Sequence, residues 1–176
     1  MTPRRPRPPA RSPTAEIRPV AGPEELERAR ELFTEYVASI RPARFASPPA
    51  HVVEEIAGLP GAYRPPAGTL LLAWDGATAV GAVGVRPLRD GRGELKHLYV
   101  RAPARARGLG RALVLAAVEF AARAGYAELV LDTLPEMAGA IALYASLGFH
   151  EVRAYWPNPV EDARFFALAL PAARTT

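Results

Sequence analysis

Two Asp-Gly dipeptides separate three apolar runs in the middle of this chain of 176 residues. Asp75-Gly76 and Asp90-Gly91 lie between runs that cover residues 69–74, 79–88 and 94–101. Asp-Gly between two apolar runs is a strong signal for a tight hairpin, since both residues tolerate the positive φ angles that such turns require. The sequence therefore predicts a three-stranded antiparallel meander over residues 69–101.

On either side of this meander the apolar residues recur at helical spacing in some segments and form short strand-like runs in others. We expect helices from Pro23 to just before Pro42, around residues 52–57, over residues 109–124 and between Thr133 and Gly148, and strands over residues 16–20, 128–132, 149–153 and 164–170. Thr133 and Glu136 have the spacing of a capping box for the last helix. This order predicts an α/β fold of the mixed α+β kind, in which helices cover both faces of a central, mostly antiparallel mixed sheet of about seven strands.

The net charge of +4 comes from the first fifteen residues, which hold four arginines among prolines and contain no acidic residue. We expect residues 1–15 to form a disordered Pro/Arg-rich tail. Residues 16–176, in which basic and acidic side chains balance, are expected to form a single domain. A neutral domain lacks the clustered basic face that nucleic acid requires, so we expect no nucleic-acid partner.

The chain contains no cysteine, which excludes disulfides, thiolate metal sites and a cysteine nucleophile. Its three histidines do not have metal-ligand spacing, and we therefore expect no metal cofactor. No apolar run approaches the roughly 18 residues that span a bilayer. We therefore expect no membrane partner and a soluble, cytoplasmic protein.

The segment from Glu94 to Arg111 combines the end of a strand, a tight loop and a helix that begins with two glycines. The first turn of a helix exposes backbone N–H groups and the positive end of the helix dipole, and glycine lets a phosphate approach the backbone closely. Arg105, Arg107 and Arg111 add cations that can bind phosphate oxygens in bidentate fashion. The segment is therefore predicted to bind a pyrophosphate group.

Two common nucleotide-binding motifs are excluded at this place. The ATP and GTP loop would need GK[ST] after the glycines, and the dinucleotide fingerprint GxGxxG would need a glycine at position 113, which is leucine. The pattern RxxGxG, formed by Arg105, Gly108 and Gly110, is weak alone and gains specificity from the strand before it and the helix after it.

These motifs resemble the GCN5-related N-acetyltransferase (GNAT) superfamily, which has a strand ending in LxV, a [QR]xxGx[GA] loop and a following helix. Here LxV is Leu98-Tyr99-Val100, the loop runs from Arg105 to Gly110, and the family's AxxLYxxLGF motif runs from Ala140 to Phe149. The stretches LYVR, LDTLPEM, ALYASLGF and YWPNPV look like a bacterial branch of the superfamily with largely unassigned substrates. The resemblance therefore implies the GNAT acyltransferase fold.

The resemblance also implies acetyl-coenzyme A (acetyl-CoA) as the cosubstrate. The expected contacts with it are Leu98, Tyr99, Val100, Arg105, Ala106, Arg107, Gly108, Leu109, Gly110, Arg111, Met137 and Tyr144. In the family the backbone of the LxV strand pairs with the pantetheine arm, and the N–H of Leu98 is the candidate donor to the thioester oxygen. Met137 departs from the family pattern, since many relatives carry an asparagine there that helps to hold the cofactor.

Two residues are expected to carry the proton transfers. Tyr144 matches the family tyrosine that protonates the departing thiolate. A base is also needed, because an alkyl amine is mostly protonated at neutral pH. Glu94, which matches the catalytic carboxylate of histone-acetylating relatives, is the predicted base, directly or through water, since strand alternation places it on one face with Leu98. His97 has a suitable intrinsic pKa but falls on the opposite face unless a bulge intervenes.

The predicted function is transfer of an acetyl group to a primary amine of a small molecule or peptide. Direct attack in a ternary complex is expected, because the chain has no cysteine to hold the acyl group. Substrate contacts are expected in residues 41–50 and 155–162, with Arg41, Arg44, Phe45 and Trp156 as candidates. The alternative is a non-catalytic acyl-CoA binding or sensing module, which would need neither Glu94 nor Tyr144. A homodimer is compatible with the sequence.

Overall fold

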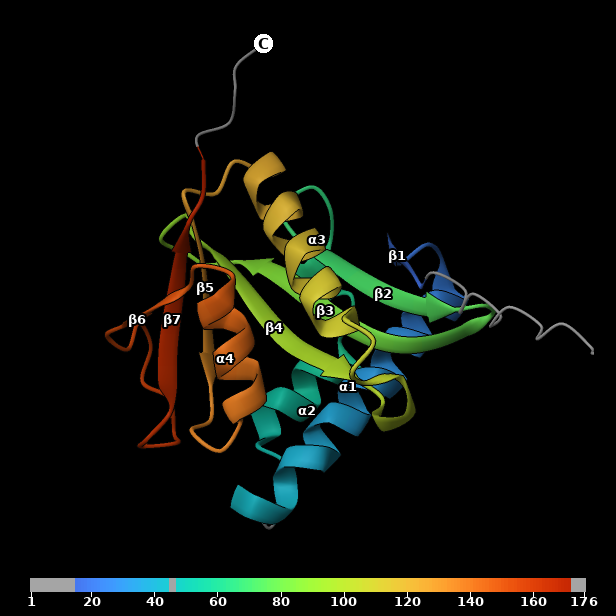
Figure 1. Ribbon diagram of the computed structural model, residues 1–176, viewed down its shortest axis with the longest axis horizontal. Coiled ribbons are helices and arrows are strands. Elements are labelled where there is room, and N and C mark those ends of the chain that lie inside the picture. Colours follow the sequence, from blue (N-terminus) through green and yellow to red (C-terminus); the bar gives the residue numbers. More distant parts are fainter. Residues whose placement is uncertain (1–14, 45–46, 172–176) are drawn as a thin grey trace, which may run out of the picture.

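A seven-stranded sheet with helices on both faces organises the computed structural model, which describes residues 15–44 and 47–171, with residues 41–44 as backbone only (Figure 1). The strands are β1 (Glu16–Pro19), β2 (Thr69–Asp75), β3 (Thr78–Pro87), β4 (Gly93–Val100), β5 (Glu128–Thr133), β6 (His150–Val152) and β7 (Arg164–Ala169). The helices are α1 (Pro23–Arg44), α2 (Ala50–Ala57), α3 (Leu109–Arg123) and α4 (Ala138–Ser146), with short 3-10 turns at Gly61–Tyr63 and Ala102–Ala104. The predicted order of elements and the predicted fold class are confirmed, whereas the predicted tail lies, apart from Ala15, outside the described residues.

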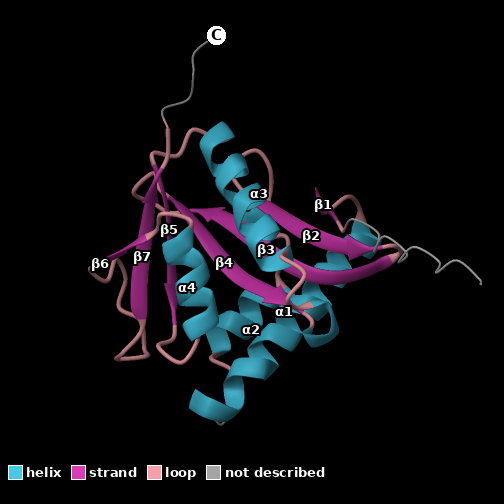
Figure 2. Cartoon of the chain, in the orientation of Figure 1, coloured by secondary structure: helices cyan, strands magenta, loops and turns pink. Residues whose placement is uncertain are grey.

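The sheet has the strand order β1-β2-β3-β4-β5-β7-β6, and its centre is the predicted meander. β2 pairs with β3 and β3 with β4, both antiparallel. β5 then runs parallel to β4, but the register pairs only Gly93 with Leu129 and Glu94 with Val130. Beyond Glu94 the two strands diverge toward their C-terminal ends (Figure 2). The centre of the sheet is therefore split on the C-terminal side of Glu94.

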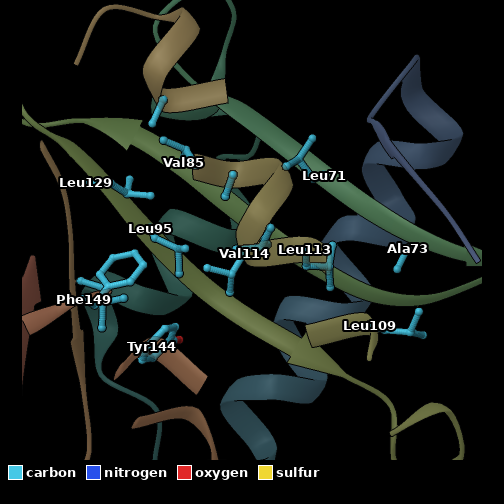
Figure 3. Close-up of a cluster of buried hydrophobic side chains, with 14 of the residues drawn as sticks. Leu71, Ala73, Val85, Leu95, Leu109, Leu113, Val114, Leu129, Tyr144 and Phe149 are labelled. Carbon is cyan, nitrogen blue, oxygen red and sulfur yellow. The ribbon is translucent and has the colours of Figure 1, made fainter. Parts of the chain in front are cut away.

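Apolar residues cover both faces of the sheet. In β2, Leu70 and Leu72 pack in a core with α1 and α2. Leu71 and Ala73, which alternate with them, pack in a second core with α3 and α4. Figure 3 shows this second core, in which Leu113 of α3 is fully buried. A strand buried on both faces needs apolar residues at every position, which explains the continuous apolar run of β2.

Helix α1 is longer than predicted, since it continues through Pro42 to Arg44. A proline inside a helix removes one backbone N–H, and here that N–H would have bonded the carbonyl of Ala38. Pro42 lies in the last turn, so only this bond near the end of the helix is lost. Neither α1 nor any other helix in the described part of the chain is long and apolar enough to cross a membrane.

The predicted capping box at the start of α4 is wrong. Thr133 is the last residue of β5, where it pairs with Arg164 of β7, and its backbone is therefore extended. Helix α4 begins only at Ala138, with Met137 as its N-cap residue and without a side-chain capping bond. The hydroxyl of Thr133 instead lies 3.6 Å from the sulfur of Met137. Sheet pairing extends β5 by one residue and moves the start of the helix away from the predicted cap.

Candidate active site

A cavity of about 120 Å³ lies where β4 and β5 no longer pair. Its walls come from α1, α2, β4, β5, the start of α4 and the loop after β6. Leu98, Met137, Tyr144 and Trp156 line it, so the structure brings together predicted residues that are up to 58 positions apart in the chain. The cavity therefore joins the predicted acyl-transfer residues to a predicted substrate-binding residue.

A β-bulge in β4 shapes this cavity. Lys96 pairs with Gly84 and Tyr99 with Ala82, so His97 and Leu98 both stand opposite the single residue Val83. His97 has a positive φ of 55°, which is uncommon for a residue other than glycine. A bulge leaves one residue of the strand unpaired with its neighbour.

The bulge corrects the predicted alternation along β4. After it, Leu98 packs against the core with α3 and α4, as Leu95 does before it. The ring of His97 lies on the other face, 4.7 Å from the ring of Phe33 and 5.8 Å from that of Tyr36, measured between centroids. His97 and Glu94 therefore share the α1 and α2 face, and Leu98 does not.

The imidazole of His97 is paired with Glu55 of α2. His97 Nε2 lies 2.9 Å from Glu55 Oε1, and Arg86 Nη1 donates to Glu55 Oε2 at 2.9 Å. The hydroxyl of Tyr63 also donates to Glu55. Burial opposes ionisation of Glu55, but the hydrogen bond with His97 and the positive charge of Arg86 lower the pKa of its carboxyl to about 2. Burial lowers the pKa of His97 below its ordinary value, so the ring is neutral at pH 7.

Glu94 is enclosed by two partners. Only 1% of its surface is exposed. Arg86 Nε donates to Glu94 Oε2 and the hydroxyl of Tyr155 donates to Glu94 Oε1, each at 2.8 Å. Glu94 borders a second, more open cleft with Arg86 and Tyr155, and it is not part of the lining of the cavity that holds Tyr144. The predicted base, Glu94, thus lies beside the cavity and does not line it.

Tyr144 projects from α4 toward β4 and lies near Leu95 in Figure 3. Its ring packs against Phe149 and Phe166, with centroids 5.7 and 6.5 Å away. Burial raises the pKa of Tyr144 above its ordinary value, so the phenol keeps its proton at neutral pH. Met137, at the start of α4, lines the same cavity, and its sulfur accepts the hydroxyl of Tyr36 at 3.9 Å.

The loop between β4 and α3 has the backbone that phosphate binding requires. Ala106 and Gly108 both have positive φ angles, of 61° and 77°. No atom lies within 4 Å of the place where a Cβ of Gly108 would stand, so the backbone there is open to a ligand. The N–H groups of the first turn of α3, which includes Leu109 and Gly110, have no acceptor within the helix. These residues fit the pyrophosphate of acetyl-CoA.

The three arginines of this region have different partners. Arg105 Nε donates to the carbonyl of Val100 at 2.9 Å, and its guanidinium lies 5.9 Å from the centroid of the Tyr99 ring. Arg107 forms an ion pair with Asp75 at 2.5 Å. Arg111 donates to the hydroxyl of Ser146 at 3.0 Å. All three are exposed and lie at the rim of the open backbone.

Several polar residues of the site were not found from the sequence. Lys96 Nζ lies 3.0 Å from Asp132 Oδ1, which bridges β4 and β5 at the split, and Asn158 donates to Asp132 Oδ2 at 2.8 Å. Burial opposes the charge of Lys96, but Asp132 and Glu94 outweigh it and raise its pKa. Lys96 is the only lysine of the chain, a signal that could have singled it out. No feature of the sequence around Glu55 could have singled it out in this way.

Within the described residues, no three His, Asp or Glu side chains are grouped to hold a metal ion.

The predicted substrate residues are only partly described. Trp156 lies in the cavity wall, with the ring of His51 at 6.3 Å and the ammonium of Lys96 at 6.0 Å from its ring centroid. Its indole nitrogen is buried and has no hydrogen-bond partner among the described residues. Arg41 and Arg44 lie in the last turn of α1 and only their backbone is described. Phe45 lies outside the described residues.

Comparison with known proteins identifies the family. The sequence profile of the acetyltransferase (GNAT) family matches residues 27–149. The chain belongs to this family. It is therefore an N-acetyltransferase, and the predicted resemblance is confirmed at the level of the family.

Related sequences include an uncharacterized N-acetyltransferase of Schizosaccharomyces pombe, 37% identical over 122 residues, which are 68% of this chain and 75% of the relative. Human N-acetyltransferase 8 is 43% identical over 75 residues, which are 40% of this chain and 33% of that protein. The match thus spans about a third of the length of the human relative. These relatives are eukaryotic, so the predicted bacterial branch is not confirmed.

Solved structures support the fold. A GNAT acetyltransferase from Staphylococcus aureus Mu50 aligns with a TM-score of 0.74 and 19% identity over 90% of this chain and 100% of that chain. The structure of yncA from Salmonella typhimurium with its cofactor acetyl-CoA aligns with a TM-score of 0.67 and 20% identity over 89% of this chain and 94% of that chain. At such identities the likeness concerns the fold.

Proposed function

We propose that this GNAT N-acetyltransferase moves an acetyl group from acetyl-CoA to a primary amine of a small molecule or peptide. The observation that carries the proposal is the cavity at the split between β4 and β5, with Leu98 and Tyr144 in its lining. The same strand leads directly into the open backbone at Gly108 and the start of α3. A single strand–loop–helix unit can therefore hold a pyrophosphate at one end and present the acyl group to the cavity at the other.

The residues that would hold acetyl-CoA form two groups. The backbone from Arg105 to Arg111 would bind the pyrophosphate through N–H groups and the helix dipole. The backbone from Leu98 to Val100 would pair with the pantetheine arm, as the family resemblance implies. Met137 lies in the cavity wall and would make an apolar contact where many relatives have an asparagine. When bound, acetyl-CoA supplies the acetyl thioester.

The chain's own groups can carry the chemistry of transfer. The bulge leaves one strand residue unpaired, which favours the N–H of Leu98 as the donor to the acyl oxygen. Tyr144 would give its proton to the departing sulfur, and its raised pKa keeps it in the required acid form. Glu94, the predicted base, would act through water or through a neighbouring side chain, since Arg86 and Tyr155 enclose it. No cysteine can hold the acyl group, so the amine attacks directly in a ternary complex.

The acceptor is proposed to carry an apolar body beside its amine. The cavity wall away from β4 is made largely of apolar side chains of α1, of α2 with the residue before it, and of the loop after β6, namely Val37, Ile40, Pro49, Val52, Trp156 and Val160. A pocket with an apolar wall on one side and polar groups on the other favours a ligand whose apolar part lies on that wall and whose orientation the polar groups fix. Arg41, Arg44 and Phe45, next to this wall in the sequence, stay proposed substrate contacts, and a homodimer and a cytoplasmic location stay predictions.

A screen of amines with acetyl-CoA tests this function. Release of free thiol is followed for pairs of primary amines of similar size, one apolar and one polar, for example 2-phenylethylamine and a hydroxylated alkyl amine. We expect acetylation of at least one primary amine, with a higher kcat/KM for the apolar member of each pair. Tight binding of acetyl-CoA in calorimetry without thiol release for any amine would instead support the non-catalytic binding module. Preference for the polar members would contradict the apolar acceptor.

A further inference from the structure

The bulge that His97 would need in order to act as the base is present in β4. His97 lies in the cavity wall together with Leu98 and Tyr144, on the face from which α1 and α2 close the cavity. Its φ of 55° is a strained conformation for a residue with a side chain, and such strain is concentrated at functional sites. We propose that His97, oriented by Glu55, is the base that accepts the proton of the attacking amine. This inference rests on the proposed acetyl transfer.

The pairing with Glu55 decides which nitrogen of His97 can act. Nε2 lies 2.9 Å from the Glu55 carboxylate, which can only accept, so the neutral ring carries its hydrogen on Nε2. Nδ1 is then left as the acceptor. Within the described residues, the ring makes no other hydrogen bond, and the nitrogens buried without a partner are the indoles of Trp74 and Trp156. Among the described residues Nδ1 therefore has no hydrogen-bond partner and is not a fully buried atom, so it can accept a proton.

Glu55 is itself held in position, which a positioning residue requires. Arg86 binds its second oxygen, and Tyr63 donates to the first. Arg86 also binds Glu94, so the carboxylate of Glu94 fixes the guanidinium that fixes Glu55. In this arrangement two residues, Arg86 and Glu55, connect Glu94 to His97. The enclosure of Glu94 then helps to hold Arg86 and Glu55 in place, and it does not prevent His97 from acting as the base.

The proton balance of the reaction is closed by two side chains. His97 Nδ1 accepts the proton that the amine nitrogen loses as the nitrogen–carbon bond forms, and Glu55 stabilises the resulting imidazolium. Tyr144 donates its proton to sulfur as the carbon–sulfur bond breaks. Solvent then carries a proton from the imidazolium to the phenolate, so both groups return to their starting forms. The net change is one amide and one thiol from one amine and one thioester.

The described charged and titratable groups around His97 bear on its protonation. Glu55 from α2 favours the imidazolium, while Lys96 from β4 and Arg86 from β3 oppose it. Tyr36 from α1 faces the ring edge-on and Phe33 covers it. Burial is the largest cause of the lowered pKa of His97, and it leaves the ring neutral at pH 7. A base must be unprotonated at the working pH, and this environment meets that condition.

Nuclear magnetic resonance of the free protein tests the dyad without any acceptor. The nitrogen signals of His97 are expected to report a hydrogen on Nε2 and a titration midpoint below about 6.5. Glu55→Gln is expected to lower that midpoint further, because the carboxylate that stabilises the imidazolium is gone. A hydrogen on Nδ1, or a midpoint that rises in Glu55→Gln, would overturn the assignment.

Kinetics with 2-phenylethylamine as the probe tests the role of the ring. His97→Asn, which tolerates a positive φ, is expected to lower kcat by about 10²–10⁴-fold. The rise of kcat with pH through the imidazole midpoint should vanish, while the affinity for acetyl-CoA stays unchanged. His97→Gly removes the ring and relaxes the backbone, and added imidazole is expected to restore part of its activity. Glu94→Gln keeps the ring of His97, so its kcat should still rise with pH through an imidazole midpoint.

The possible results separate the two proposals. An active wild type together with full activity of His97→Asn contradicts the role of His97 alone. Loss of the pH dependence in Glu94→Gln and not in His97→Asn assigns the base to Glu94 instead. A wild type that binds acetyl-CoA but releases no thiol with any amine contradicts the proposed function, and the role of His97 with it.

Discussion

The two sides of β4 are built in different ways. The proposed donor side, which we define as residues 98–111, is one continuous segment and offers mainly backbone groups. The acceptor side, defined as Glu55, Arg86, Glu94 and His97 with the Lys96–Asp132 pair, is a network of side chains from α2, β3, β4 and β5. Backbone groups at a helix start are set by local conformation, whereas the network exists only after the chain has folded. Substitutions on the two sides should therefore damage different steps of the reaction.

Tyr144→Phe tests the residue that stands between the two sides and should have the largest effect. Removal of the phenolic proton is expected to lower kcat by about 10²–10⁴-fold, with acetyl-CoA affinity unchanged in calorimetry. Because burial raises the pKa of Tyr144, wild-type activity should not fall as the pH approaches 10. Tyr126→Phe, which removes a hydroxyl bonded to the carbonyl of Ala67 outside the site, is the matched control and should keep its kcat. Equal losses in both variants would contradict the acid role.

Gly108→Glu tests the donor side alone. The side chain would occupy open space in front of the loop and place a negative charge where the pyrophosphate is expected. We expect the Kd for acetyl-CoA to rise by at least about 100-fold, or about 2.7 kcal/mol. A positive φ also strains the backbone, so a control needs the same strain.

Gly125→Glu provides that control at the other end of α3. Gly125 has a φ of 84° and no atom within 4 Å of a Cβ position, as at Gly108. Its variant should lose similar stability and bind acetyl-CoA as the wild type does. If both variants lost affinity equally, backbone strain and not the ligand site would explain the effect.

The contrast between the donor side and the acceptor side also explains which parts of the structure could be predicted from the sequence. The meander and the loop from Arg105 to Gly110 depend on contacts within short segments, and turn residues and helix signals predicted them. The Asp-Gly turns, the apolar periods and the family motifs all point to the same fold. The structure of the proposed donor side is therefore predictable because it belongs to the backbone of a local motif.

The acceptor side could not be predicted in the same way. Strand alternation put His97 on the wrong face, because one bulged residue reverses the order of faces and no residue type marked the bulge. Glu55 lies 42 positions before His97, and Asp132 lies 36 positions after Lys96, so no spacing rule connects them. Glu94 was singled out by position in the family, but its enclosure by Arg86 and Tyr155 depends on tertiary packing.

The pH dependence of stability tests the electrostatic character of the acceptor side. The pKa of Glu55 falls from an ordinary value of 4.5 to about 2 in the folded protein. A lowered folded-state pKa stabilises the protein above pH 4.5, and this stabilisation is lost as the pH falls through 4.5 toward 2. The loss from this one group is about 3 kcal/mol.

Urea unfolding of the wild type and of Glu55→Gln between pH 5 and 2 measures that contribution. The wild type should lose about 3 kcal/mol more than the variant over this range. Glu119→Gln, which removes an exposed carboxylate of α3, is the control and should follow the wild type. If the free energies of unfolding of wild type and Glu55→Gln changed with pH in parallel, the charge of Glu55 would not stabilise the acceptor side.

The smallest effect is expected at the contact between a hairpin and the donor side. The ion pair of Asp75 with Arg107 lowers the pKa of Asp75 and occupies a guanidinium that we propose as a partner of the pyrophosphate. Asp75→Asn removes a competing anion, so the Kd for acetyl-CoA should fall a few-fold, and added salt should reduce the difference. Asp90→Asn is closely matched, because Asp90 also stands in an Asp-Gly turn and pairs with an arginine, Arg92. It lies in the other hairpin and should leave the Kd unchanged. A weaker Kd in Asp75→Asn would instead mean that the ion pair holds the loop in its binding conformation, and the donor side would then depend on a tertiary contact as the acceptor side does.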